Sequence, residues 1–96
     1  MNRWVLQATL TERAAVRYTP AGLPALDVVL SHLGQASEDG QTRQLAFATK
    51  AVAIGAITQR LQAMALNTPA VFAGFISASR NGRGLRFHIT SIDSTS

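Results

Sequence analysis

Apolar and polar side chains alternate at the start of the chain. From Trp4 to Leu10 every second residue is apolar, and the residues between them are polar except for Val5. A period of two residues is typical of a strand with one buried face. The pattern predicts a first strand over residues 3–13, with Trp4 on its buried side.

Turn-forming residues follow this first strand. Residues 18–24 contain Pro20 and Gly22, which favour a tight turn because proline fixes φ and glycine tolerates positive φ. Alternation then returns over 25–33. We therefore expect the first two strands to form a hairpin joined by an arginine-bearing loop.

The middle of the chain changes period twice. Residues 34–42 are polar, small and bounded by glycine, and they predict an exposed loop. Residues 43–52 alternate again and predict a third strand. After Gly55, apolar residues recur at helical spacing over 56–66, which predicts a short helix.

The last third of the chain predicts two more strands. Residues 71–79 form the fourth, in which Gly74 indicates a bend or bulge. Residues 85–92 form the fifth, after the hairpin signal Asn81-Gly82. Alternation in the fourth strand places its two phenylalanines on opposite faces, so one of them is expected at a subunit contact.

The predicted order of elements indicates the fold. Three strands, a short helix and two strands form the element order of the OB-fold, a five-stranded, partly open Greek-key barrel. The sequence therefore predicts an all-β protein with a single OB-fold domain over residues 1–96. The helix between the third and fourth strands is expected to plug one end of the barrel.

Composition narrows the functional classes. Cysteine is absent, which excludes disulfides, thiolate nucleophiles and cysteine-bound metals. No apolar run approaches the ~18 residues of a membrane helix, and the first residues do not read as a signal peptide. We therefore expect a cytoplasmic protein without membrane contact.

Charge indicates an anionic partner. Nine basic residues oppose five acidic ones, giving a net charge of +4, and every basic residue except Lys50 is arginine. A basic small domain is typical of proteins that bind nucleic acid. The alternative is that positive charge only maintains solubility.

In an OB-fold the first-hairpin loop, the third strand and the last hairpin border one groove. The candidate cations there are Arg13, Arg17, Arg43, Lys50, Arg80, Arg83 and Arg86.

Aromatic side chains could supply base stacking, which works on any base and suits single strands. Tyr18 is the best candidate because it follows Arg17 in the expected groove-facing loop. Phe47 is either a stacking platform or a core residue, and the sequence leaves both open. Trp4 and Phe87 are expected in the core.

Catalysis finds little support in the sequence. His32 and His88 are isolated from each other and from carboxylates at metal-ligand or acid–base spacing. The glycines at 82 and 84 lack the Gly-Lys-Ser/Thr of a phosphate-binding loop. We expect a non-enzymatic protein without cofactor or metal.

Several segments resemble a known family. The start Asn-Arg-Trp-Val-Leu, the Pro-x-Gly-x-Pro turn at 20–24, Val-Leu-Ser-His ending at His32, Arg43-Gln44 and Gly-Phe-Ile-Ser at 74–77 occur in order. They resemble the primosomal replication protein N family, a relative of the bacterial single-stranded DNA-binding proteins. The resemblance implies a homodimeric OB protein that binds single-stranded DNA at stalled forks. It also implies contact with a PriA-type helicase and other primosome proteins, and help in helicase loading.

The resemblance extends to individual positions. Arg17 falls where the family has a DNA-contacting lysine, and the arginines at 80, 83 and 86 fall in or beside its lysine-rich last hairpin. The family's stacking tryptophan aligns with Ala46, and Phe47 should face the opposite side unless a bulge rotates it. Two alternatives therefore stay open. One is an OB-fold interaction subunit that contacts mainly the helicase, and the other is a tailless tetrameric single-stranded DNA-binding protein.

Overall fold

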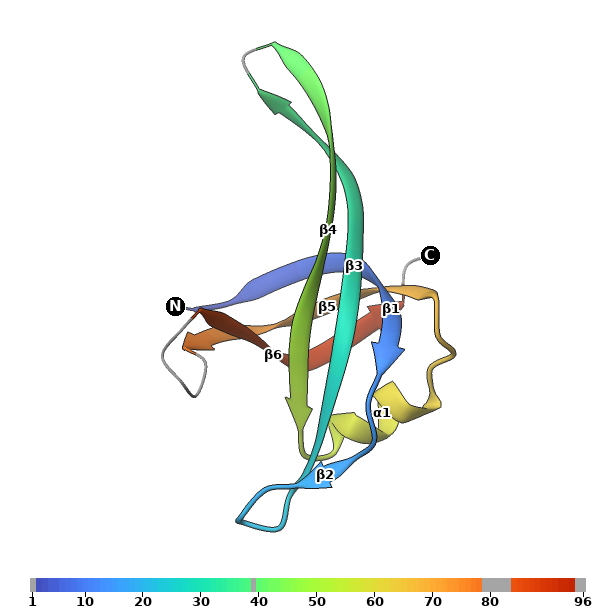
Figure 1. The fold of residues 1–96 in the computed structure, drawn as a ribbon, viewed down its shortest axis with the longest axis vertical. Helices are drawn as coiled ribbons and strands as arrows, with labels where there is room; N and C mark the ends of the chain where they lie inside the picture. The colour runs from blue at the N-terminus through green and yellow to red at the C-terminus, as the bar shows by residue number, and fades with distance from the viewer. Residues whose placement is uncertain (1, 39, 79–83, 95–96) are drawn as a thin grey trace.

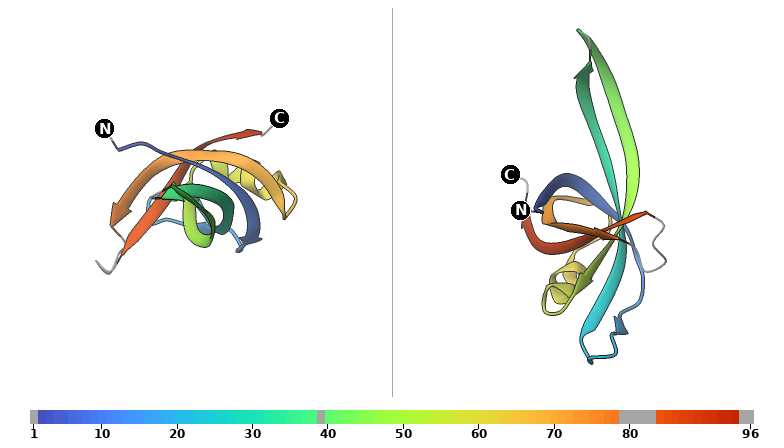
Figure 2. Two further views of the ribbon diagram at one scale, coloured as in Figure 1. Left: turned by 90° about the horizontal axis from the view of Figure 1, so that it is seen from above. Right: turned by 90° about the vertical axis from the view of Figure 1, so that its left-hand side faces the viewer.

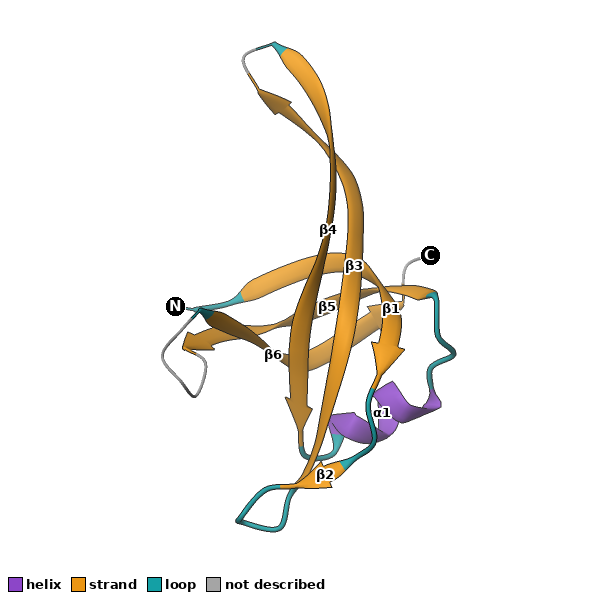
Figure 3. Ribbon diagram, in the orientation of Figure 1, coloured by secondary structure: helices purple, strands orange, loops and turns teal. Residues whose placement is uncertain are grey.

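The computed structural model describes residues 2–38, 40–78 and 84–94 (Figure 1). Within these ranges the chain forms six strands and one helix (Figure 3). They are β1 (Trp4–Arg13), β2 (Arg17–Tyr18), β3 (Pro24–Glu38), β4 (Gln41–Ile54), α1 (Ile57–Ala63), β5 (Thr68–Ala78) and β6 (Leu85–Ser94). The five long strands are the predicted ones, and β2 is a two-residue addition that pairs with the start of β3.

The sheet closes into the predicted OB-type barrel. Strand β1 pairs with β5, β5 with β6, β6 with β4 in a short parallel contact, and β4 with β3. Strand β3 returns to β1 and closes the ring. The β1–β3 register shifts between Leu10 and Glu12. Such a bulge bends a strand, and here it lies where β1 leaves β5 for β3. Helix α1 lies below the barrel between β4 and β5, as expected (Figure 3).

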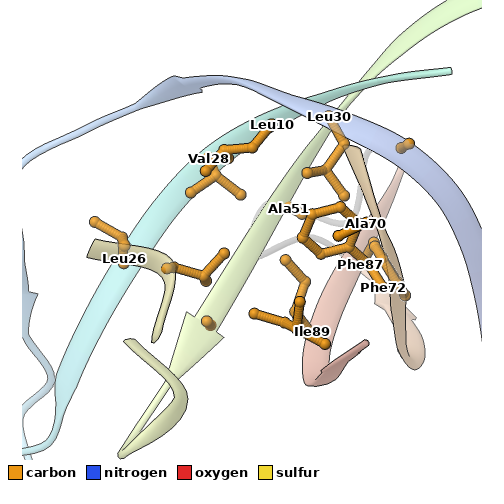
Figure 4. Packing of buried hydrophobic residues seen from close by; sticks show 13 residues of the cluster. Leu10, Leu26, Val28, Leu30, Ala51, Ala70, Phe72, Phe87 and Ile89 are labelled. Atoms are coloured by element: carbon orange, nitrogen blue, oxygen red, sulfur yellow. The ribbon is translucent and has the colours of Figure 1, made fainter. Parts of the chain in front are cut away.

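The core follows the alternation seen in the sequence. Leu10, Leu30 and Phe72 are fully buried and pack inside the barrel (Figure 4). Phe87 is also buried, as predicted, but the expectation for Trp4 is wrong because 55% of its surface is exposed. Trp4 keeps the phase of the core positions, yet it pairs with Gly74 at the far end of the β1–β5 ladder, where the barrel no longer covers it.

The loop predicted over 34–42 is wrong. The β3–β4 ladder continues without a register shift to Glu38–Gln41, so only residues 39 and 40 connect the strands. The sequence Asp-Gly at positions 39 and 40 favours a two-residue hairpin turn, and Gly40 has a φ of +77°. The hairpin projects from the barrel (Figure 2). Strands that project beyond the barrel do not need apolar residues to pair through their backbones. The pattern of apolar residues therefore gave no sign of the projecting part of β3 and β4.

Gly74 marks a bulge, as the sequence predicted. The β5–β6 register shifts between Ala73 and Gly74, and β6 carries the extra residue Thr90. The two backbones approach so closely there that an added Cβ at position 74 would lie 1.7 Å from the carbonyl oxygen of His88. Only glycine fits this position without a shift of the strands.

Candidate nucleic-acid interface

Two cations lie on the outer side of the barrel, on the neighbouring strands β4 and β6. Ala51 in β4 and Phe87 in β6 are buried and pair with each other. Their neighbours Lys50 and Arg86 therefore point outward, because successive side chains in a strand alternate. Each lies one residue before the Ala51–Phe87 pair, so the two cations project from neighbouring strands near the start of this short parallel contact. Like charges in such positions repel each other, so an anion bound between them would relieve that repulsion.

An ion pair borders these cations. Arg17 of β2 donates from Nε to Oδ2 of Asp27 at 2.9 Å and from Nη2 to Oδ1 at 3.3 Å. Asp27 lies on β3 opposite Val52, on the outer side of the sheet. The hydrogen bond from Arg17 lowers the pKa of Asp27, and Arg86 adds a smaller lowering. The same pairing raises the pKa of Arg17. Both groups are therefore charged at neutral pH, and Asp27 compensates the charge of Arg17.

A stacked ring pair completes this outer surface. The rings of Phe75 on β5 and His88 on β6 lie 4.6 Å apart with an interplanar angle of 5°. The Oγ of Ser77 lies 2.7 Å from Nε2 of His88. Phe75 is 39% exposed whereas Phe72 is buried, as the predicted opposite faces require. We define the outer face by its charged and aromatic members, which are Arg17, Asp27, Lys50, Phe75, Arg86 and His88.

His88 should make stability depend on pH. Burial lowers the pKa of His88 below its ordinary 6.5, and Arg86 lowers it further. As the pH falls below 6.5, the unfolded chain binds a proton that the folded protein resists, so the free energy of unfolding decreases. We expect denaturant titrations to show lower stability at pH 5 than at pH 7, and His88→Gln to flatten that difference. An unchanged pH profile in the variant would contradict this assignment.

Tyr18 is the most exposed of the aromatic candidates, at 71%. It follows Arg17 in β2 and pairs with Pro24. Neighbouring residues of a strand point to opposite sides, so Tyr18 points to the side of β2 opposite Arg17 and is not a member of the outer face.

Phe47 is not a core residue, which was one of the two possibilities that the sequence left open. It is 47% exposed and lies on the inner phase of β4, where its ring centroid is 5.1 Å from that of His32. His32 is held by a 2.6 Å hydrogen bond between its Nδ1 and the carbonyl oxygen of Gln7. Since the β3–β4 ladder has no bulge here, Ala46 and Phe47 face opposite sides. Phe47 therefore lies on the side of the sheet opposite to the one that Ala46 faces, as the sequence predicted in the absence of a bulge.

Arg13 lies apart from the other cations. Its Nη1 donates to the carbonyl oxygens of Leu61 at 2.9 Å and Met64 at 2.7 Å, at the end of α1. Arg13 also pairs with Val28, a core residue, so it lies on the inner side of the sheet. The structure gives this arginine a role in holding the helix against β1.

The side chains of the remaining candidates are not among those that the structure describes. The backbone of Arg43 pairs with Ala36 in the projecting hairpin, but its side chain is not among those described. Arg80 and Arg83 lie outside the described residues. The structure therefore joins Arg17, Lys50 and Arg86 on one surface.

Sequence reasoning missed three members of the outer face. Asp27 was not considered, Phe75 was considered only for a subunit contact, and His88 only for metal or acid–base chemistry. The cross-strand register that places them on the outer face is not visible in local periodicity.

Among the described side chains, no three His, Cys, Asp or Glu residues gather as a metal site would need. The described part of the chain has no helix with the length and hydropathy to cross a membrane.

Comparison with known proteins gives consistent results. Residues 2–91 match the model of a family described as "Another single-strand binding protein family". Replication restart protein PriB of Bordetella pertussis is 38% identical over 80 residues, which cover 83% of this chain and 75% of the relative. The structure of PriB from Ralstonia solanacearum superposes with a TM-score of 0.88 at 38% identity, covering 100% of this chain and 99% of that one. The single-stranded DNA binding protein from Thermus aquaticus shares the fold, with a TM-score of 0.75 at 24% identity, covering 100% of this chain and 50% of that one.

Proposed function

This chain belongs to the replication restart protein PriB family, within the single-strand binding proteins, and on that basis we propose that its outer face binds single-stranded DNA during replication restart. The observation that supports the proposal is that Lys50 and Arg86 both point outward from neighbouring strands, each one residue before the buried Ala51–Phe87 pair. Phosphates would lie against these two cations and Arg17. Bases would stack on Phe75, and exposed Tyr18 would stack a base only where the strand passes beyond the outer face to the other side of β2.

Three further cations belong to the proposal on sequence grounds alone. Arg43, Arg80 and Arg83 lie in segments next to the outer face in chain order, and each would add a phosphate contact. Arg13 is left out because its guanidinium already serves the end of α1. Phe47 is left out because it lies on the inner phase of β4.

Partners of the protein are part of the same proposal. We infer that it acts as a non-enzymatic homodimer that contacts a PriA-type helicase and other primosome proteins and assists helicase loading. Exposed Trp4 and Val5 support a second copy at the start of β1. In the described chain, residues 4–8 pair with β5 alone, but the carbonyl oxygen of Gln7 already bonds His32, so the edge at residues 4–6 is available to a further strand.

A fluorescence-anisotropy titration with single-stranded, duplex and forked DNA at two salt concentrations tests the function. We expect single strands to bind best, with log affinity falling by about 0.7 per phosphate neutralised for each decade of salt. Single-strand affinity weaker than about 100 μM at physiological salt, the weak non-specific range, would refute it. Tight helicase binding in that case would favour an interaction subunit, which the alanine at position 46 also favours. A mass of four chains would instead indicate a tetrameric single-stranded DNA-binding protein.

Phe75 gives a prediction that separates stacking from charge. Phe75→Leu keeps apolar contact with His88 but removes the ring face, so we expect about fivefold weaker binding, near the lower limit of about 1 kcal/mol for one stacked base. The salt slope should not change, because no cation is lost. Tyr18→Leu, measured in the same way, reports how much the Tyr18 ring contributes to DNA affinity. A change in slope with either variant would mean that the ring acts through the cations.

A further inference from the structure

An acidic residue lies within the cationic outer face. Asp27 pairs with Val52, and Val52 pairs with His88, so the carboxylate lies in a row that crosses three strands of this face. A negative charge here repels phosphate. Folding alone gives a weak reason for it, because the side chains of Arg17 and Asp27 are 49% and 46% exposed. Exposed ion pairs contribute only about 0.2–1 kcal/mol.

The pairing geometry explains how Asp27 acts on Arg17. The Nε and Nη2 donors together form one bidentate edge of the guanidinium, and both carboxylate oxygens of Asp27 accept from it. Phosphate oxygens bind the same kind of edge. A phosphate must therefore displace Asp27 or bind an arginine whose charge is already compensated. In either case the paired Arg17 attracts DNA less strongly than a free arginine would.

We propose that Asp27 sets the strength of single-stranded DNA binding by compensating the charge of Arg17 on the outer face. The inference rests on the proposed function, because it needs phosphate to approach this face. In this role Asp27 lowers the affinity for single-stranded DNA and the salt dependence of that affinity. It does not act by holding Arg17 in position for the DNA.

Asp27→Asn tests the proposal directly. The amide keeps the size of the side chain and one oxygen that can accept from Arg17, but the negative charge is lost. If one more phosphate is neutralised, the salt slope becomes steeper by about 0.7, which corresponds to about fourfold tighter binding at 0.15 M salt relative to a 1 M reference. The gain should shrink as the salt concentration rises towards 1 M.

A double-mutant cycle identifies Arg17 as the residue through which Asp27 acts. We expect Arg17→Ala to weaken binding less than twofold in the wild-type background, and about fourfold in the Asp27→Asn background, where a full phosphate contact is lost. Equal losses in both backgrounds would mean that Asp27 repels DNA independently of Arg17, which overturns the proposed coupling.

Asp93→Asn is the matched control. It makes the same change in net charge at an exposed position of β6. Asp93 lies five residues from His88, or about 17 Å along the strand. Unchanged or weaker binding by Asp27→Asn, or an equal gain in Asp93→Asn, would overturn the role of Asp27.

The Lys50→Ala/Arg86→Ala variant separates the Asp27 inference from the proposed function. If it binds normally, the proposed function of this face fails, whereas if it binds weakly while Asp27→Asn has no effect, only the Asp27 inference fails.

Discussion

Gly74→Ala should lower the free energy of unfolding by about 3 kcal/mol or more. The added Cβ would lie 1.7 Å from the carbonyl oxygen of His88 and 3.1 Å from the amide nitrogen of Thr90. Both are backbone atoms, which cannot rotate away as a side chain can, so β5 and β6 must separate at their bulge. Overpacking of a well-packed core costs about 1–3 kcal/mol when side chains can adjust, and here the strands themselves must move.

Gly22→Ala is the control for Gly74→Ala. No atom lies within 4 Å of its added Cβ, but φ is +85°, so only backbone strain is introduced. Left-handed backbone costs an ordinary residue about 1–2 kcal/mol. Denaturant unfolding of both variants would therefore separate overlap from strain. A Gly74→Ala variant no less stable than Gly22→Ala would show that the β5–β6 contact relaxes easily.

The fold could be predicted because burial leaves a two-residue period in the sequence. Leu10, Leu30 and Phe72 lie on the apolar phases of their strands, and all three are in the core. The period says which side of a strand is apolar but not where the barrel ends, and Trp4 was misplaced for that reason. The same limitation hid the projecting hairpin, whose strands beyond the barrel do not need apolar residues. The Asp-Gly sequence at positions 39 and 40 was the available signal.

The outer face could be predicted only in part. Arg17, Lys50 and Arg86 were found because arginine and lysine are chemically conspicuous and the OB-fold brings their strands together. Asp27 becomes part of the site only when β2 folds onto β3, and Phe75 only when the β5–β6 register places it on His88. Arg13 shows the opposite limitation, since composition cannot distinguish a phosphate contact from an arginine that binds helix carbonyls.

Lys50→Ala combined with Arg86→Ala should weaken single-stranded DNA binding about fourteenfold at 0.15 M salt. Each cation is expected to neutralise one phosphate, so the two losses reduce the salt slope by about 1.4, and the fold-change follows from that slope relative to 1 M salt. The double substitution also removes the repulsion between these two like charges, so the folded protein should keep its stability. Anisotropy titrations at several salt concentrations, with a thermal melt of each variant, measure both effects.

A helix variant shows whether position or total charge matters. Gln59→Glu with Arg60→Ala also lowers the net charge by two, but on exposed positions of α1 below the barrel. Glutamate in the first turn suits the helix dipole, so the fold should tolerate the change. If binding needs the outer face, this variant should bind nearly as well as wild type, with its salt slope retained. If both pairs of substitutions weaken binding equally, DNA senses only the net charge of the protein, and the placement of Lys50 and Arg86 on the outer face has no special role.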